Sequence, residues 1–120
     1  MTEESKGFQG LKAWQKAYDL ALHIYVLTKS FPKGETYGLV TQLQRAVVSV
    51  SANIAEGYER QHRKEYLQFL FIAKGSLGET ETYLLLARDL GYITPTEYAI
   101  ADEKRKETSK LLRGLIKSLS

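Results

Sequence analysis

Residues 36–59, TYGLVTQLQRAVVSVSANIAEGYE, decide the fold of this chain. Apolar side chains recur there at alternating steps of three and four residues, at Val40, Leu43, Val47, Val50 and Ile54. This period makes one face of an α-helix apolar. The middle of the stretch, residues 46–51, alternates like a β-strand and is rich in β-branched side chains, which favours a strand locally. The longer period decides, and a helix is predicted over residues 36–59.

Residues 11–31, before this stretch, carry two neighbouring apolar rows with helical spacing. One row passes through Ala17 and Ile24, and the other through Trp14, Tyr18 and Tyr25. Two rows make an apolar face wider than one partner helix requires. The helix is therefore predicted to pack against the other helices of its own bundle and also against a surface outside that bundle. The helix is predicted over residues 11–31, where the helix-breaking sequence FPKG, residues 31–34, ends it.

Residues 63–90 form the longest predicted helix. Two glycines, Gly75 and Gly78, interrupt its middle, and each costs about 1 kcal/mol of helix propensity relative to alanine. Interior glycines at this spacing indicate close approach of another backbone. One helical row of this segment passes through Phe69, Ile72, Ser76, Glu79, Tyr83, Leu86 and Leu90.

The last helix is predicted over residues 95–119, because its start carries three signals. Thr94 can cap the helix, Pro95 fits its first position and Glu97 completes a capping box. Short links between four helices favour antiparallel neighbours, so the sequence predicts one all-α domain, residues 1–120, with up-down-up-down topology. Its expected core is Val40, Leu43, Val47, Val50, Ile54, Leu70, Leu77, Leu84, Leu112 and Leu115.

Composition narrows the class of protein. The 120 residues include 17 Lys and Arg against 14 Asp and Glu, a formal net charge of +3. Cysteine is absent, which excludes disulfide scaffolds, thiolate metal sites and cysteine nucleophiles. Residues 1–10 lack the apolar segment of a secretory signal, and no apolar run reaches the ~18 residues of a membrane span. We therefore expect a cytoplasmic protein without membrane association.

Basic residues gather in the second half of the last helix. Lys106, Lys110, Arg113 and Lys117 recur at steps of four, three and four, so they share one helical face. Such a face is typical of phosphate contact. It is equally typical of a solvated helix surface, and basic residues near a helix C-terminus also complement the helix dipole.

A polar stripe runs beside the apolar row of residues 36–59 and includes Arg45, Ser49, Asn53 and Glu56. We expect a hydrogen-bond network between helices in which Arg45 and Asn53 meet Glu79. A ligand or subunit contact is the alternative, and the spacing does not distinguish the two.

The hypotheses of enzymatic activity and of metal binding have weak support in the sequence. The Glu59–His62 pair matches the spacing of a di-iron motif, but a second copy is missing because Leu20 stands where His23 would need a carboxylate. The carboxylates Glu56, Glu79 and Glu81 could supply an acid–base pair, without an accompanying nucleophile. We expect no metal, no cofactor and no enzymatic activity, with a hydrolase as the least favoured alternative.

Several motifs together resemble a known family. They are QLQRA at residues 42–46, NIAEG at residues 53–57 and GSLGE at residues 75–79. The chain resembles, over residues 8–118, the four-helix-bundle family of 23S ribosomal RNA intervening-sequence proteins. It departs from that pattern by lacking a proline near Ser51 and Ala52, and by having His62 in place of a serine cap, which is expected to fray the third helix.

The resemblance implies an all-helical bundle that assembles into a ring-like homopentamer. A relative of the family, the accessory protein of diversity-generating retroelements, binds nucleic acid and a reverse transcriptase, so both are expected partners by resemblance. We expect binding of RNA or DNA through Lys106, Lys110, Arg113 and Lys117, with Trp14, Tyr18 and Tyr25 at subunit contacts. The alternative is a protein-interaction scaffold that does not bind nucleic acid.

Overall fold

Four long helices account for most of the chain. The computed structural model describes residues 4–120, which contain no β-strand, so the predicted all-helical class is confirmed. Residues 1–3 of the predicted domain lie outside this range. Short 3₁₀ segments, η1 (Glu4–Gly10), η2 (Thr28–Ser30) and η3 (Lys33–Glu35), accompany the helices α1 (Lys12–Leu27), α2 (Leu39–Tyr58), α3 (Arg63–Asp89) and α4 (Pro95–Leu119).

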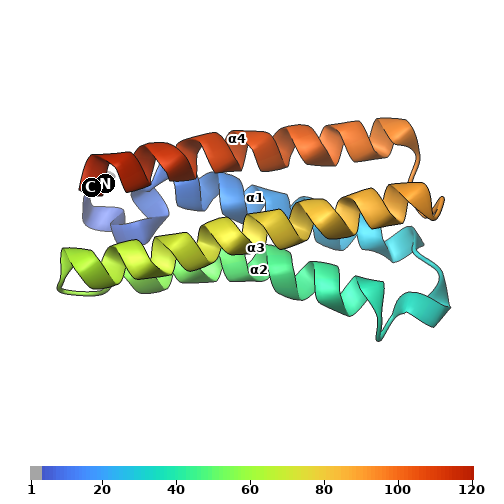
Figure 1. Ribbon diagram of the computed structural model, residues 1–120, viewed down its shortest axis with the longest axis horizontal. Helices are drawn as coiled ribbons and strands as arrows, with labels where there is room; N and C mark the ends of the chain where they lie inside the picture. The colour runs from blue at the N-terminus through green and yellow to red at the C-terminus, as the bar shows by residue number, and fades with distance from the viewer. Residues whose placement is uncertain (1–3) are drawn as a thin grey trace.

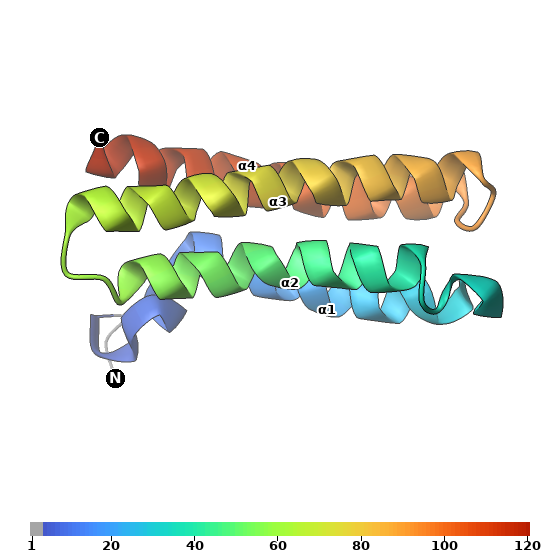
Figure 2. The ribbon, with the colours of Figure 1, turned by 60° about the horizontal axis from the view of Figure 1, so that its bottom comes forward.

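The helices lie side by side in a bundle of 43 × 26 × 21 Å, and each runs back along the one before it (Figure 1). α1 packs against α2 and α4, and α3 packs against the same two helices. Figure 2 shows α1 beside α2 and α3 beside α4 as two layers. α1 and α3 consequently occupy one diagonal of the bundle, while α2 and α4 occupy the other.

The row of α2 that predicts the helix also forms the centre of the core. Leu43, Val47, Val50 and Ile54 are fully buried, and Leu70, Leu77 and Leu84 of α3 and Leu112 of α4 pack with them. The prediction is wrong at two positions. Val40 and Leu115 are half-buried residues at the margin of the core, because each lies towards an end of the bundle where fewer neighbours cover it.

α3 turns inward the face that carries Leu70, Leu77 and Leu84, as the expected core has it. Its buried side chains are those of Leu70, Ala73, Ser76, Leu77, Thr80, Leu84 and Ala87. Ile72, Leu86 and Leu90, which lie in the row through Phe69 and Tyr83, are each about half exposed, at 51%, 46% and 52%. The Thr80 hydroxyl is accommodated in the core because it donates a hydrogen bond to the Ser76 carbonyl at 2.8 Å.

The glycines of the helix interiors have different surroundings. A Cβ on Gly57 would lie 2.9 Å from the Phe69 Cβ, so Gly57 allows the close packing of α2 on α3. A Cβ on Gly75 or Gly78 would meet nothing within 4 Å. The close backbone approach predicted at these two residues therefore does not occur within the described chain.

The two connections at one end of the bundle are joined by a carboxylate. Glu35 Oε1 accepts a hydrogen bond from the Leu39 N–H at 3.1 Å, which caps the start of α2. Its Oε2 accepts one from the Tyr92 hydroxyl at 2.6 Å. These bonds to the ionised form lower the pKa of Glu35, chiefly through Tyr92. The predicted capping box of α4 is also present, with Thr94 and Glu97 bonded reciprocally.

None of the helices in the described part of the chain combines the length and the apolar character that crossing a membrane requires.

Substituting Leu77 by alanine is expected to lower the free energy of unfolding by about 2 to 4 kcal/mol, because the side chain is 3% exposed and leaves a cavity. Chemical denaturation followed by circular dichroism measures this. The control is Tyr37→Ala: Tyr37 is 95% exposed, so the change should stay within about 0.5 kcal/mol. Equal effects of both variants would contradict this assignment of the core.

Substituting Tyr92 by phenylalanine is expected to lower the melting temperature more at about pH 7 than at about pH 3. Glu35 has a lowered pKa in the folded state, so its contribution to stability is present above the ordinary carboxyl pKa and is lost as the pH falls through the lowered value. Thermal melts of both proteins across this pH range provide the measurement. A difference that does not change with pH would show that Tyr92 acts through packing alone.

Candidate nucleic-acid interface

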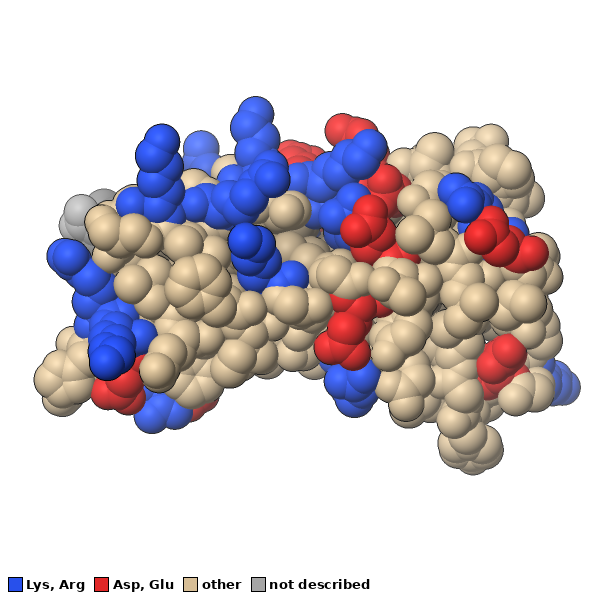
Figure 3. Space-filling view, in the orientation of Figure 1, with Lys and Arg blue, Asp and Glu red and all other residues tan. Residues whose placement is uncertain are grey.

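The basic residues predicted on α4 all lie on the side of the helix that faces away from the core. Lys106, Lys110, Arg113 and Lys117 are exposed, whereas Thr108 and Leu112 between them are buried. Figure 3 shows Lys and Arg side chains gathered over the C-terminal half of α4, at the upper left of the molecule. We call these four residues the α4 basic face.

The members of the α4 basic face differ in how far nearby acids neutralise them. Lys106 Nζ lies 3.6 Å from Asp102 Oδ2. Within residues 4–120, Lys110, Arg113 and Lys117 form no ion pair. Their positive charges are therefore available to an external anion, and the charge of Lys106 is available only in part.

A partly buried ion-pair cluster holds α4 against α3. Arg105, whose side chain is 11% exposed, donates from Nε to Asp102 Oδ1 at 2.7 Å and from Nη2 to Glu81 Oε2 at 3.0 Å. Sequence reasoning missed this role of Arg105. The available signal was the position of Arg105 in the helical row that also carries Ala101 and Leu112, since a charged residue requires partners when it is buried.

The polar network predicted between α2 and α3 has two separate parts. Arg45 donates to Glu79 Oε2 at 3.0 Å and also to Gln42 Oε1 at 2.9 Å. Asn53 does not meet Glu79, because its amide donates to the carbonyl and hydroxyl oxygens of Ser49 at 2.8 and 2.9 Å. Ser76 of α3 completes this second part by donating to the Ser49 hydroxyl at 2.8 Å.

Glu56 lies outside both parts and pairs with Arg60 of its own chain segment. The three carboxylates considered as catalytic acids therefore have three different arginine partners: Arg60 for Glu56, Arg45 for Glu79 and Arg105 for Glu81. The structure brings no two of these three together as an acid–base pair. Among residues 4–120, no group of three His, Cys, Asp or Glu side chains is arranged to hold a metal ion.

The aromatic residues predicted at subunit contacts are not equivalent. Trp14 is half-buried and packs between the rings of Phe8 and Tyr18, with centroids 5.3 and 4.9 Å away. Tyr18 and Tyr25 are 47% and 45% exposed. The two tyrosines consequently have surface available to a partner, whereas much of Trp14 is covered by its own chain.

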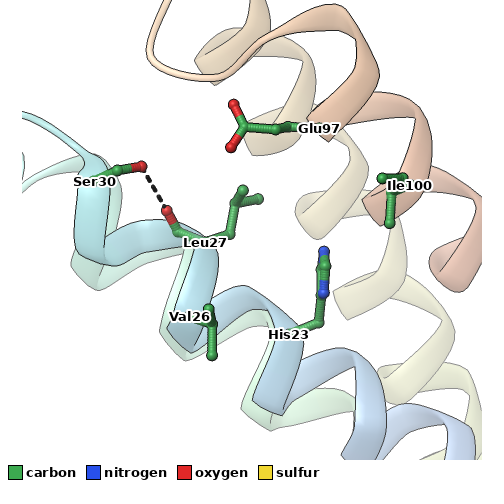
Figure 4. A pocket seen from close by; sticks show the side chains of 6 residues that line it. All are labelled: His23, Val26, Leu27, Ser30, Glu97 and Ile100. Atoms are coloured by element: carbon green, nitrogen blue, oxygen red, sulfur yellow. Dashed lines mark hydrogen bonds between the residues drawn. The ribbon is translucent and has the colours of Figure 1, made fainter.

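A hollow of about 330 Å³ lies between α1 and α4 (Figure 4). Figure 4 shows the His23 ring extending from α1 towards Ile100 of α4, with the Glu97 carboxylate at the opposite end. His23 Nε2 has no hydrogen-bond partner among the described groups. Burial, followed by the charge of Lys104, lowers the pKa of His23, which favours the neutral imidazole.

The other polar groups of this hollow are already engaged. Glu97 accepts a hydrogen bond from the Thr94 N–H at 2.9 Å, and the Ser30 hydroxyl donates to the Leu27 carbonyl at 3.1 Å. Neither bonds to His23, so the arrangement does not form a proton-transfer pair. Sequence reasoning considered His23 only as a metal ligand and did not predict the hollow.

Comparison with known proteins relates the chain to a protein family and to solved structures of similar fold. A family model described as "23S rRNA-intervening sequence protein" matches residues 9–114. A crystal structure from Bacteroides thetaiotaomicron, described as a protein of unknown function from the S23 ribosomal protein family, has 30% sequence identity and a TM-score of 0.81. The match covers 88% of this chain and 98% of that one. A search of curated proteins finds no match.

Proposed function

This chain belongs to the 23S rRNA-intervening sequence protein family, and on that premise we propose that it is a non-enzymatic, homo-oligomeric bundle that binds RNA or DNA through the α4 basic face. The observation that carries the proposal is the group of three exposed cations, Lys110, Arg113 and Lys117, that form no ion pair within the described residues. Cations of this kind bind phosphates and release the counterions that surround them.

The chemistry of this surface favours phosphate contact over base recognition. From Lys104 to Lys117 the helix has no aromatic residue on which a base could stack. Lysine and arginine on one exposed helical face can follow a chain of phosphates without reading its sequence. We therefore propose binding with little sequence preference and a location in the cytoplasm, where ribosomal RNA is found.

The assembly that we propose is the ring-like homopentamer implied by the family resemblance, with Tyr18 and Tyr25 at subunit contacts. Trp14 would contribute by stacking on the Tyr18 ring within its own subunit. A ring would repeat the α4 basic face in every subunit. Several weak phosphate contacts made at once raise the overall affinity without any new kind of contact. By the same resemblance, a reverse transcriptase is a candidate protein partner.

A protein-interaction scaffold without nucleic-acid binding is the second candidate. It is favoured by the large apolar side chains that α1 and α3 expose, among them Leu22, Val26, Phe71 and Ile72. In that case the α4 basic face would only be solvated.

Removing the three cations together, as Lys110→Ala, Arg113→Ala and Lys117→Ala, is expected to abolish most nucleic-acid retention at low salt, because these side chains supply the phosphate contacts. Filter binding of a single-stranded RNA and a duplex DNA in rising salt measures this. Wild-type binding should fall steeply with salt, and the slope of log affinity against log salt should become smaller in the variant.

The matched control keeps the charges and exchanges the side chains, as Lys110→Arg, Arg113→Lys and Lys117→Arg. It should bind like the wild type, because phosphate contact of this kind depends on charge. Equal retention by the wild type and the alanine variant, or none by the wild type at low salt, would favour the scaffold.

A further inference from the structure

One outer surface of α3 is apolar and has no partner within the chain. Phe71, Ile72 and Leu86 are 53%, 51% and 46% exposed. Gly75 and Gly78 lie between them, and a Cβ on either would meet nothing within 4 Å. We call these five residues the glycine face. Glycine in a helix interior is costly, and nothing within the described chain explains it here.

α1 exposes a surface of the opposite shape. Leu22 and Val26 are 54% and 65% exposed, and Tyr18 and Tyr25 flank them. We call these four residues the α1 ridge, because all four side chains are large and project from the bundle. A hollow of about 280 Å³ adjoins the ridge and extends to Val48 and Ser51 of α2.

The two surfaces cannot cover each other within one molecule, because α1 and α3 lie on a diagonal of the bundle. We propose that the α1 ridge of one copy packs onto the glycine face of a second copy. This proposal rests on the homo-oligomer proposed above and specifies its contact surfaces. Large side chains of one helix fit where the other has only backbone, so the two helix axes can approach closely.

The direction of α1 and α3 and the charged residues at their ends indicate which residues face each other in this contact. α1 and α3 run in the same direction, so Lys29, just after α1, and Asp89, at the end of α3, lie at the same end of the bundle. In a parallel arrangement, Leu22, Val26 and Lys29 have the same spacing as Thr82, Leu86 and Asp89. This pairs Val26 with Leu86 and Tyr18 with Gly78. It also brings the exposed Lys29 to Asp89, which pairs with Arg88 of its own helix and whose side chain is 66% exposed.

A contact between two different faces of the same chain is heterologous, so it repeats from copy to copy and closes into a ring or continues as a filament. Joining subunits through α1 and α3 leaves the outer faces of α2 and α4 uncovered. In a ring, the α4 basic face would then occupy an equivalent, uncovered position in every copy. A symmetric contact between two glycine faces would instead leave the α1 ridge exposed to water.

The test uses one variant for each surface and light scattering coupled to size-exclusion chromatography. Gly75→Gln with Gly78→Gln fills the glycine face, and Leu22→Glu with Val26→Glu makes the α1 ridge acidic. Each variant is expected to have the mass of a monomer, whereas the wild type is an oligomer. Gly114→Gln is the matched control, because Gly114 is an exposed helix glycine with nothing near its Cβ position, and it should keep the wild-type mass.

Mixing the two variants decides between a heterologous and a symmetric contact. Each keeps one intact surface, so an equimolar mixture is expected to form a dimer of twice the monomer mass. The glycine variant should keep the helical circular-dichroism spectrum of the control variant, because glutamine forms helix better than glycine, and this excludes unfolding as the cause of dissociation.

Three outcomes would overturn the proposal. They are a glycine variant that remains oligomeric, variants that stay monomeric when mixed, and a wild type that is itself a monomer. The last would also remove the assembly from the proposed function. In the first two the wild type remains an oligomer built through other surfaces, and the nucleic-acid binding proposal is unaffected.

Discussion

The burial of one apolar row of α2 is the constraint on which the rest of the structure depends. Val47, Val50 and Ile54 are fully buried because the other three helices surround them. Side chains of this kind each contribute about 1.5 to 3 kcal/mol when they leave water. Gly57, at the end of the same helix, lets α3 pack closely against α2. The turn that follows returns α3 along α2, and the positions of α1 and α4 follow from that pair.

Polar groups at the edges of the core determine how the helices are joined. Arg105 pairs with Asp102 on its own helix and with Glu81 on α3. The burial of the Arg105 charge is therefore tolerated only in the relative position of α3 and α4 that keeps both carboxylates beside it. At one end of the bundle, Glu35 holds the start of α2 to Tyr92 in the α3–α4 connection. Apolar packing alone tolerates some sliding of helices, whereas these directional bonds do not.

The surface divides into regions with different chemistry, and the arrangement of the helices sets that division. α4 presents its basic face to solvent, while α1 and α3 expose large apolar side chains on opposite sides of the bundle. Exposed apolar surface is tolerated when a partner covers it. The proposed assembly and the proposed nucleic-acid contact therefore use different helices, and one molecule can engage in both at once.

The sequence by itself determined the four helices, the ends of α3 and α4 and the exposed basic face of α4, whereas α1 ends at Leu27 instead of residue 31 and α2 begins at Leu39 instead of residue 36. Those features are local, because a period of 3.6 residues records which side of a helix is buried, and caps such as Thr94 and Glu97 act within one turn. The sequence also placed Leu70, Leu77 and Leu84 of α3 in the core. Only the tertiary structure decided that Ile72 and Leu86, which lie in another apolar row with helical spacing, are half exposed. It also decided the partners of Arg105, Asn53 and Glu56. Contacts between helices depend on the rotation of each helix about its axis, which no local pattern specifies.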